Sequence, residues 1–277
     1  MACLFKERKK TMLNLGNEFN KRPNLSLAMV VILTTLLSAP TTESAEVDQI
    51  FKDPINLGPS INSTAQEFEP SISADGLELY FHSYRSGGLG GGDLYVTARK
   101  TKTDPWGKAV NFGPTVNSPA GDKGACISAD GLSLYFDSDR SGGYGGRDLW
   151  VTTRKTKNAP WGEPVNLGPT VNSPVNEQGP SISTDGLTLY FGAWPADGSP
   201  GAWDKSDLWM TTRKTKTDPW GTPVNLGPTV NSSAYDGSPS ISDDGLSLYF
   251  DVQRGNAGSI RVTKRKGMSD PWGTPVR

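Results

Sequence analysis

The chain has 277 residues, of which 35% are apolar, so it is long enough to bury a sizeable core in one or two domains. Its 32 glycines and 21 prolines exclude a mainly helical protein and favour many short strands joined by turns. The net charge is −1, but the first 24 residues carry +4, so the remainder is near −5, which argues against nucleic-acid binding. The two cysteines, Cys3 and Cys126, form neither a disulfide framework nor a metal-binding spacing.

The N-terminal region predicts an export signal. A basic stretch precedes an apolar run from Leu25 to Leu37, and small residues follow at Ser38, Ala39 and Ala45. This run is shorter than the roughly 18 to 20 residues that span a membrane. We therefore expect residues 1–45 to be a signal peptide with a short linker, and the mature protein to be periplasmic or secreted. An uncleaved N-terminal segment that contacts the membrane is the alternative.

Four tandem repeats organise residues 46–277. An Asp-Gly pair recurs at spacings of 55, 55 and 59 residues, and a Trp-Gly pair at spacings of 55, 59 and 52. The repeats cover about residues 55–110, 111–165, 166–224 and 225–277. The Asp-Gly pairs begin at Asp75, Asp130, Asp185 and Asp244, and the Trp-Gly pairs at Trp106, Trp161, Trp220 and Trp272.

Each repeat predicts four short strands. In the first repeat, the first strand surrounds Ser71–Ser73 and ends at the Asp-Gly turn, which tolerates the positive φ angles of a tight hairpin. The second strand covers Leu77–Phe81, the third Asp93–Arg99, and the fourth Ala109–Phe112. One such sheet cannot bury its faces alone, so the sheets must stack around an axis. We predict an all-β fold, a β-propeller with four blades of four antiparallel strands.

The segments Ser-x-Asp-Gly-Leu-x-Leu-Tyr-Phe and Asp-Leu-Tyr-Val-Thr resemble the WD40-like β-propeller repeat of the TolB type, over essentially all of residues 53–277. The resemblance implies the propeller fold, in a family that includes scaffolds, partner-binding domains and accessory domains of enzymes. The segment Pro54–Gly58 has the sequence of a fourth strand, and the last repeat stops at Pro275–Arg277, where its own fourth strand begins. We therefore expect the N-terminal strand to close the last blade. A larger ring, or a ring completed by a second chain, is the alternative.

One acidic residue recurs near the start of the first strand in every repeat. Because this strand is innermost in a propeller, the four carboxylates are expected to ring the mouth of the axial channel. Hard oxygen ligands suit calcium, so the ring predicts a Ca²⁺ site in the channel. In the alternative interpretation, each carboxylate caps backbone N–H groups of a loop. The four residues are Glu67, Asp122, Glu177 and Asp236.

The loop between the second and third strands differs in the third repeat. In the first repeat it is glycine-rich, and we expect its Arg85 to pair with Asp93, which opens the third strand. The third repeat is four residues longer here and contains Trp194 and Trp203. Aromatic side chains anchor protein interfaces and stack on sugars, so both are predicted ligand-binding residues. The other interpretation is that they cover the end of the blade.

The repeats argue against catalysis, because a ring of equivalent acids offers no distinct acid and base. The chain has one histidine, His82, and Cys126 replaces a serine of the other repeats, which predicts a small buried residue.

We expect an exported, non-catalytic binding scaffold for protein or glycan partners of the cell envelope. One alternative is a carbohydrate-active enzyme, a glycosidase or lyase, with Glu67 and Glu177 as catalysts. Another is a structural module of an envelope assembly.

Overall fold

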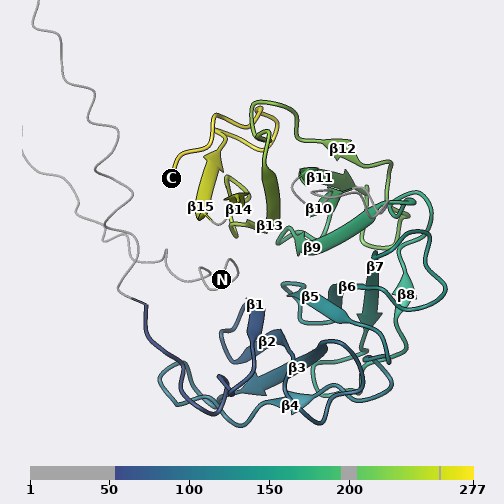
Figure 1. The fold of residues 1–277 in the computed structure, drawn as a ribbon, viewed down its shortest axis with the longest axis vertical. Coiled ribbons are helices and arrows are strands. Elements are labelled where there is room, and N and C mark those ends of the chain that lie inside the picture. Colours follow the sequence, from purple (N-terminus) through teal and green to yellow (C-terminus); the bar gives the residue numbers. More distant parts are fainter. Residues whose placement is uncertain (1–53, 195–204, 256) are drawn as a thin grey trace, which may run out of the picture. The chain divides into compact units, whose positions relative to one another are not determined.

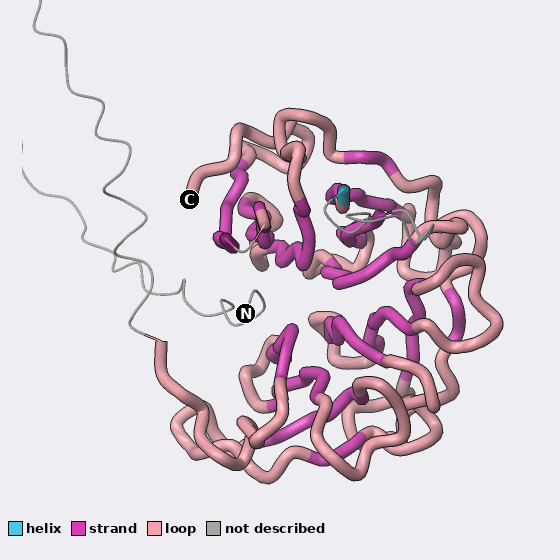
Figure 2. Tube along the Cα trace, in the orientation of Figure 1, coloured by secondary structure: helices cyan, strands magenta, loops and turns pink. Residues whose placement is uncertain are grey.

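The computed structural model describes residues 54–194, 205–255 and 257–277. One compact unit, described from Leu57 to Arg277, consists of four β-sheets arranged in a ring, as Figure 1 shows. A second unit, Arg8–Asn56, is described only over residues 54–56. Strands and loops make up nearly all of the described chain, which contains no α-helix; the short helical segment in Figure 2 is a single 3₁₀ residue, Lys205. Within the described residues, no helix has the length and apolarity that crossing a membrane requires.

Each sheet is one blade of the propeller, and its strands follow one another outward in chain order. All pairings within a blade are antiparallel. The strands of blades 1 to 4 are, in turn, β1 (Glu67–Ile72), β2 (Glu78–Ser83), β3 (Asp93–Ala98) and β4 (Val110–Asn111); β5 (Asp122–Ile127), β6 (Ser133–Ser138), β7 (Asp148–Thr153) and β8 (Val165–Asn166); β9 (Asn176–Ile182), β10 (Thr188–Trp194), β11 (Asp207–Thr212) and β12 (Val224–Asn225); β13 (Tyr235–Ile241), β14 (Ser247–Arg254) and β15 (Ala257–Lys264).

The hydrophobic core lies in the seams between consecutive blades. In the first seam, Tyr80 and Leu94 of blade 1 pack in one cluster with Ile127 and Phe136 of blade 2. Similar clusters join blade 2 to blade 3 and blade 3 to blade 4. Successive strand residues point to opposite faces, so the repeated Leu-Tyr-Phe run fills the seams on both sides of its sheet. The predicted all-β propeller with four blades is therefore confirmed.

The outer strand of blade 4 does not come from the expected segment. The sheet β13–β15 has three strands, and Val276 takes the next position by exchanging two backbone hydrogen bonds of 2.9 Å with Val262. The described part of the N-terminal segment, from residue 54 to β1, forms no strand: Ile55 is 84% exposed, and Leu57 packs on the core of blade 1. The predicted closure by the N-terminal strand is therefore corrected, because the fourth repeat fills this position with its own residues.

The innermost strands share a β-bulge where they approach the axis. The pairing of β1 with β2 shifts between Phe68 and Ser71, and β5, β9 and β13 shift at the same place. One residue of each bulge has a positive φ angle, which is unusual for any residue but glycine. These residues are Glu69 (50°), Gly124 (63°), Gly179 (58°) and Ser238 (48°).

Candidate functional site

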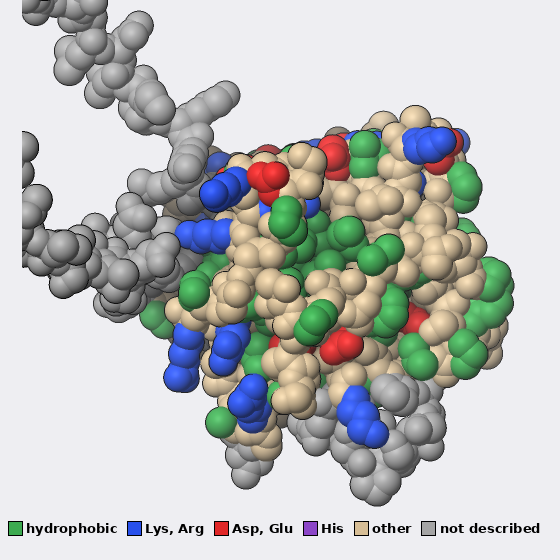
Figure 3. Space-filling view, turned by 90° about the horizontal axis from the view of Figure 1, so that it is seen from above, with side chains coloured by type: hydrophobic (Ala, Val, Ile, Leu, Met, Phe, Trp, Pro, Cys, Tyr) green, Lys and Arg blue, Asp and Glu red, His purple; other side chains and the backbone are tan. Residues whose placement is uncertain are grey.

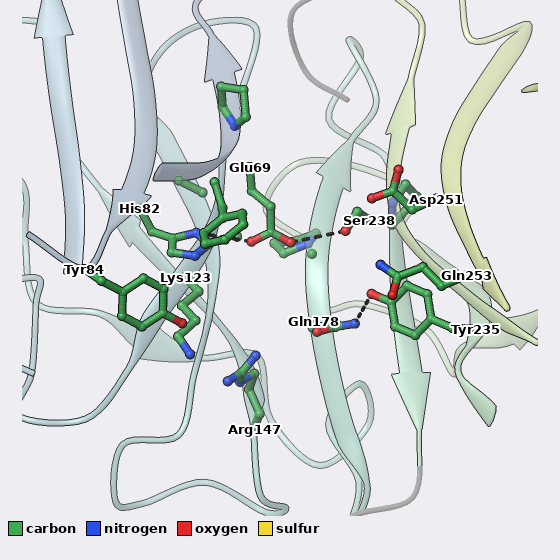
Figure 4. A pocket seen from close by; sticks show the side chains of 17 residues that line it. Glu69, His82, Tyr84, Lys123, Arg147, Gln178, Tyr235, Ser238, Asp251 and Gln253 are labelled. Carbon is green, nitrogen blue, oxygen red and sulfur yellow. Dashed lines mark hydrogen bonds and ion pairs between the residues drawn. The ribbon is translucent and has the colours of Figure 1, made fainter. Parts of the chain in front are cut away.

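Charges of both signs meet around the axis of the propeller. On the side that Figure 3 shows, Lys and Arg side chains and a few Asp or Glu side chains are scattered among hydrophobic and other uncharged residues. At the axis, a cavity of about 340 Å³ is lined by residues of all four blades, and ligand sites typically measure about 300–1,000 Å³. Its aromatic and polar side chains, most of them labelled in Figure 4, are Phe68, Glu69, His82, Tyr84, Lys123, Arg147, Gln178, Tyr235, Ser238, Asp251 and Gln253.

Two charged networks fix polar groups at the axis, in addition to a 2.6 Å hydrogen bond that Gln178 donates to the Tyr235 hydroxyl. Nδ1 of the buried His82 lies 3.3 Å from Oε2 of Glu69, whose other oxygen accepts a 3.3 Å hydrogen bond from Ser238. Nε of Arg147 lies 3.3 Å from Oδ2 of Asp137, and this carboxylate also accepts the backbone N–H of Gly179. The first network joins blade 1 to blade 4, and the second joins blade 2 to blade 3.

The acidic groups at the axis have pKa values shifted in different directions. Burial alone would raise the pKa of Glu69, but His82 and the charge of Arg147 outweigh it, so this pKa lies below its ordinary value. Burial raises the pKa of Asp137 to about 6 despite the opposing charge of Arg147. Burial also raises the pKa of Asp251. The region around the axis therefore combines one carboxyl group that favours its charged form, Glu69, with two that resist it, Asp137 and the cavity-lining Asp251.

Aromatic side chains form one rim of the cavity. Phe68 stacks on His82 with ring centroids 5.4 Å apart, and Tyr84 meets Phe68 edge-on at 6.2 Å. Phe68 and Tyr84 are 43% and 44% exposed and lie against each other, so together they present a small apolar patch to solvent. Nζ of Lys123 lies 5.2 Å from the centre of the Tyr84 ring. The rim thus offers an aromatic surface directly beside hydrogen-bonding groups.

The four carboxylates predicted to hold calcium lie elsewhere, each near the start of the innermost strand of its own blade. Each accepts the backbone N–H of a serine four residues earlier, at 2.6–3.1 Å. None of them lines the axial cavity, and the described residues contain no group of three or more acidic, His or Cys side chains that could hold a metal ion. Cation binding stays a prediction, which melting with calcium and with a chelator tests. The residues are Glu67, Asp122, Glu177 and Asp236.

The arginine of the glycine-rich loop has a different partner from the predicted one. Arg85 donates to Glu67 at 3.0 Å and to the carbonyl of Ile61 at 2.6 Å. Asp93 instead accepts backbone N–H groups of its own loop, from Leu89 at 2.7 Å and from the next residue. The predicted Arg85–Asp93 pair is therefore wrong, because the loop folds back on the aspartate and satisfies it with backbone donors.

The remaining predicted residues have mixed outcomes. Trp194 ends β10, is partly buried, and occupies the repeat position of Tyr84, but it does not line the axial cavity. Trp203 lies outside the described residues, so ligand binding by these two tryptophans stays a prediction. Cys126 is only 3% exposed, which confirms the expected small buried residue.

Sequence reasoning missed most residues of the axial cavity. They lie where the repeats differ from one another, whereas the repeated residues build turns and seams. The position of Glu69 is glycine or serine in the other repeats, and the position of His82 is aspartate or glycine. Differences among the repeats near the first strand were therefore the signal that could have indicated this site.

Neither a protein-family model nor a curated protein matches the sequence. Among solved structures, the chain is similar to an α-L-arabinofuranosidase from Lactobacillus brevis, with 13% identity and a TM-score of 0.51 over 78% of this chain and 77% of the enzyme. An α-L-arabinofuranosidase from Podospora anserina, solved with cellotriose, matches at 13% identity and a TM-score of 0.50, over 80% and 70%.

TolB from Acinetobacter baumannii is also among the similar structures, with 19% identity and a TM-score of 0.47. The match covers 75% of this chain but 45% of the TolB chain. A putative TolB from Agrobacterium tumefaciens matches at 18% identity with the same TM-score, over 75% and 61%. At such identities, the likeness concerns the propeller fold.

Proposed function

We propose that the protein is a non-catalytic binding propeller that holds a saccharide in its axial cavity. The observation that carries this proposal is the pair of exposed aromatic rings, Phe68 and Tyr84, beside a cavity lined by polar side chains of four blades. Sugars present both apolar faces and hydroxyl groups, so their sites combine aromatic surfaces with hydrogen-bonding side chains.

Several polar groups of the cavity are available to a ligand. Among the described residues, the side chains of Asp251 and Gln253 make no hydrogen bond or ion pair, and both line the cavity. Lys123 contacts the Tyr84 ring but pairs with no described carboxylate within 4 Å. A carboxylate, an amide and an ammonium group provide both donors and acceptors for sugar hydroxyls.

The proposed setting is the periplasm or the cell exterior, with glycans or glycosylated proteins of the envelope as partners. This part of the proposal depends on the export signal predicted for residues 1–45, which lie outside the described residues.

The test is saccharide binding by the Tyr84→Ala variant. A glycan array identifies a ligand for the wild type, and calorimetry then measures its Kd. We expect Tyr84→Ala to weaken binding about tenfold, which corresponds to about 1.4 kcal/mol. Tyr144→Ala is the matched control, because Tyr144 is 49% exposed in the equivalent loop of blade 2 but does not line the cavity. Equal affinity of wild type and Tyr84→Ala would contradict the proposed site.

A second candidate function is a carbohydrate-active enzyme that uses Glu69 and Asp251. Both line the same cavity, and their pKa values are shifted in opposite directions, as an acid and a base require. The pair predicted from the sequence, Glu67 and Glu177, does not line it. Oligosaccharide cleavage that disappears in Glu69→Gln and in Asp251→Asn would replace the binding proposal with this one.

A further inference from the structure

Blade 2 contains a closed internal site for one guanidinium group. Nη2 of Arg140 donates to Oδ1 of Asp122 at 2.5 Å and to the carbonyl of Val116 at 2.7 Å. The guanidinium carbon lies 5.1 Å from the ring centres of both Phe136 and Trp150. The site therefore consists of a carboxylate, a backbone carbonyl and two aromatic rings.

Blade 1 repeats this site with equivalent residues. Arg85 binds the Glu67 carboxylate and the Ile61 carbonyl, and it lies over the rings of Phe81 and Tyr95 at 5.3 and 4.7 Å. Blades 1 and 2 thus build the same guanidinium site from equivalent residues.

Blade 3 keeps the receiving groups but not the arginine. Its carboxylate is Glu177, its carbonyl belongs to Val171, and its aromatic rings are Phe191 and Trp209. The arginine position is a proline in the sequence, at residue 195, outside the described residues. Among the described residues, no cation pairs with Glu177.

Two observations indicate that this site lacks its cation. Glu177 is only 1% exposed, yet its Oε2 has no hydrogen-bond partner among the described residues, a costly arrangement for a carboxylate. Trp209 is only partly buried, whereas Tyr95 and Trp150, which lie under their arginines, are buried. Burial raises the pKa of Glu177 to about 8. The negative charge of Asp148 also raises this pKa, whereas the hydrogen bonds from Ser173 lower it.

Blade 4 differs from blade 3 in the charge that acts on its carboxylate. Among the described residues, Oδ1 of Asp236 also lacks a hydrogen-bond partner and no cation pairs with this carboxylate within 4 Å. The charge of Arg261, which stands on β15 at the repeat position of Trp209, nevertheless opposes the rise that burial causes in the pKa of Asp236. Among the described residues, no cationic charge acts on Glu177 in this way.

We propose that blade 3 binds a guanidinium group from outside the chain, the arginine side chain of a protein partner, between Glu177, the Val171 carbonyl and Trp209. The bound arginine takes the place that Arg85 and Arg140 take in their own blades. This site is separate from the axial cavity, because Gln178 lines the cavity while Glu177 precedes it in β9 and points to the other face of the sheet.

The test uses N-acetyl-arginine amide as the probe, with the neutral isostere N-acetyl-citrulline amide beside it. Calorimetry and tryptophan fluorescence of the full chain measure binding. We expect the arginine probe to bind, the citrulline probe to bind at least tenfold more weakly, and Glu177→Gln to weaken arginine binding at least tenfold. Glu67→Gln is the matched control, because Arg85 already occupies that site, and it should leave the Kd for the arginine probe unchanged.

A pH series gives a readout that a merely structural role of Glu177 would not produce. Arginine binds the charged carboxylate, so binding releases the proton that Glu177 holds below pH 8. We expect the affinity to rise between pH 6 and pH 8, and the calorimetric heat to depend on the ionisation enthalpy of the buffer. Equal binding of both probes, affinity without pH dependence, or loss in Asp251→Asn but not in Glu177→Gln would overturn the proposal.

Discussion

Arg140 connects three parts of blade 2 through a single side chain. Its Nε donates to Ser138 on β6, and its Nη2 donates to the Val116 carbonyl and to the carboxylate of Asp122. Asp122 is fully buried, and its carboxylate oxygens are bonded by this guanidinium and by donors of Ser118 and Ser138. Removing one partner of a buried ion pair leaves the other charge unpaired in a poorly hydrated environment.

Arg140→Met should therefore destabilise the protein strongly although it keeps an apolar stem in the same place. We expect a loss of about 3 kcal/mol in the free energy of unfolding, measured by urea denaturation. Arg254→Met is the control, because Arg254 holds the same repeat position in blade 4 but is exposed. Its effect should stay within about 0.5 kcal/mol. Similar losses in both variants would show that the ion pair with Asp122 contributes little.

At the scale of the strand, the β-bulge is what brings the inner strands together at the axis. Gly124, in the bulge of β5, has a φ angle of 63°, and a Cβ atom there would clash with the Asp137 carboxylate. It would also lie 3.2 Å from the backbone nitrogen of Gly179 in the next blade. Asp137 cannot move away easily, since Arg147 and the Gly179 N–H hold it. The bulge therefore needs glycine at this position for space as well as for conformation.

Gly124→Ala should cost about 3 kcal/mol, of which the positive φ angle accounts for about 1 kcal/mol and the crowding for the rest. Gly113→Ala separates the two contributions, because Gly113 has a φ angle of 74° but a methyl group there would meet no described atom within 4 Å. We expect that variant to lose about 1 kcal/mol in the same urea experiment. Equal losses would mean that the neighbouring blade does not crowd Gly124.

The sequence predicted those elements whose signal is local and repeated four times. The Asp-Gly turns and the Leu-Tyr-Phe runs indicated the inner three strands of each blade, because turn chemistry and alternation act within a few residues. The outer strands span only two residues, such as Val110–Asn111, so alternation could not decide between Val276 and the N-terminal segment for blade 4. The axial site depends on the bulge at Glu69 and on contacts between blades. The residue pattern of one repeat reveals neither of them.

At the scale of the whole molecule, the seams are not equally buried. One isoleucine recurs at the end of each innermost strand. In blades 2, 3 and 4 this isoleucine is buried in the cluster that joins its blade to the preceding one. The three residues are Ile127, Ile182 and Ile241. In blade 1 the equivalent Ile72 is only partly buried, in a cluster with Leu57 and Ile61 of the N-terminal segment. Among the described residues, a preceding blade contributes nothing to that cluster, so less apolar surface is removed from water there.

Ile127→Ala and Ile72→Ala compare these two environments with the same chemical change. We expect Ile127→Ala to lose about 3 kcal/mol, because Ile127 is fully buried and a cavity would remain between two blades, and Ile72→Ala to lose about 1 kcal/mol. Urea denaturation followed by tryptophan fluorescence and by circular dichroism measures both losses. Coincident transitions would also show that the blades unfold as one cooperative unit. If Ile72→Ala cost as much as Ile127→Ala, the N-terminal segment would be burying that isoleucine as well as a neighbouring blade does, and the difference between the seams would not hold.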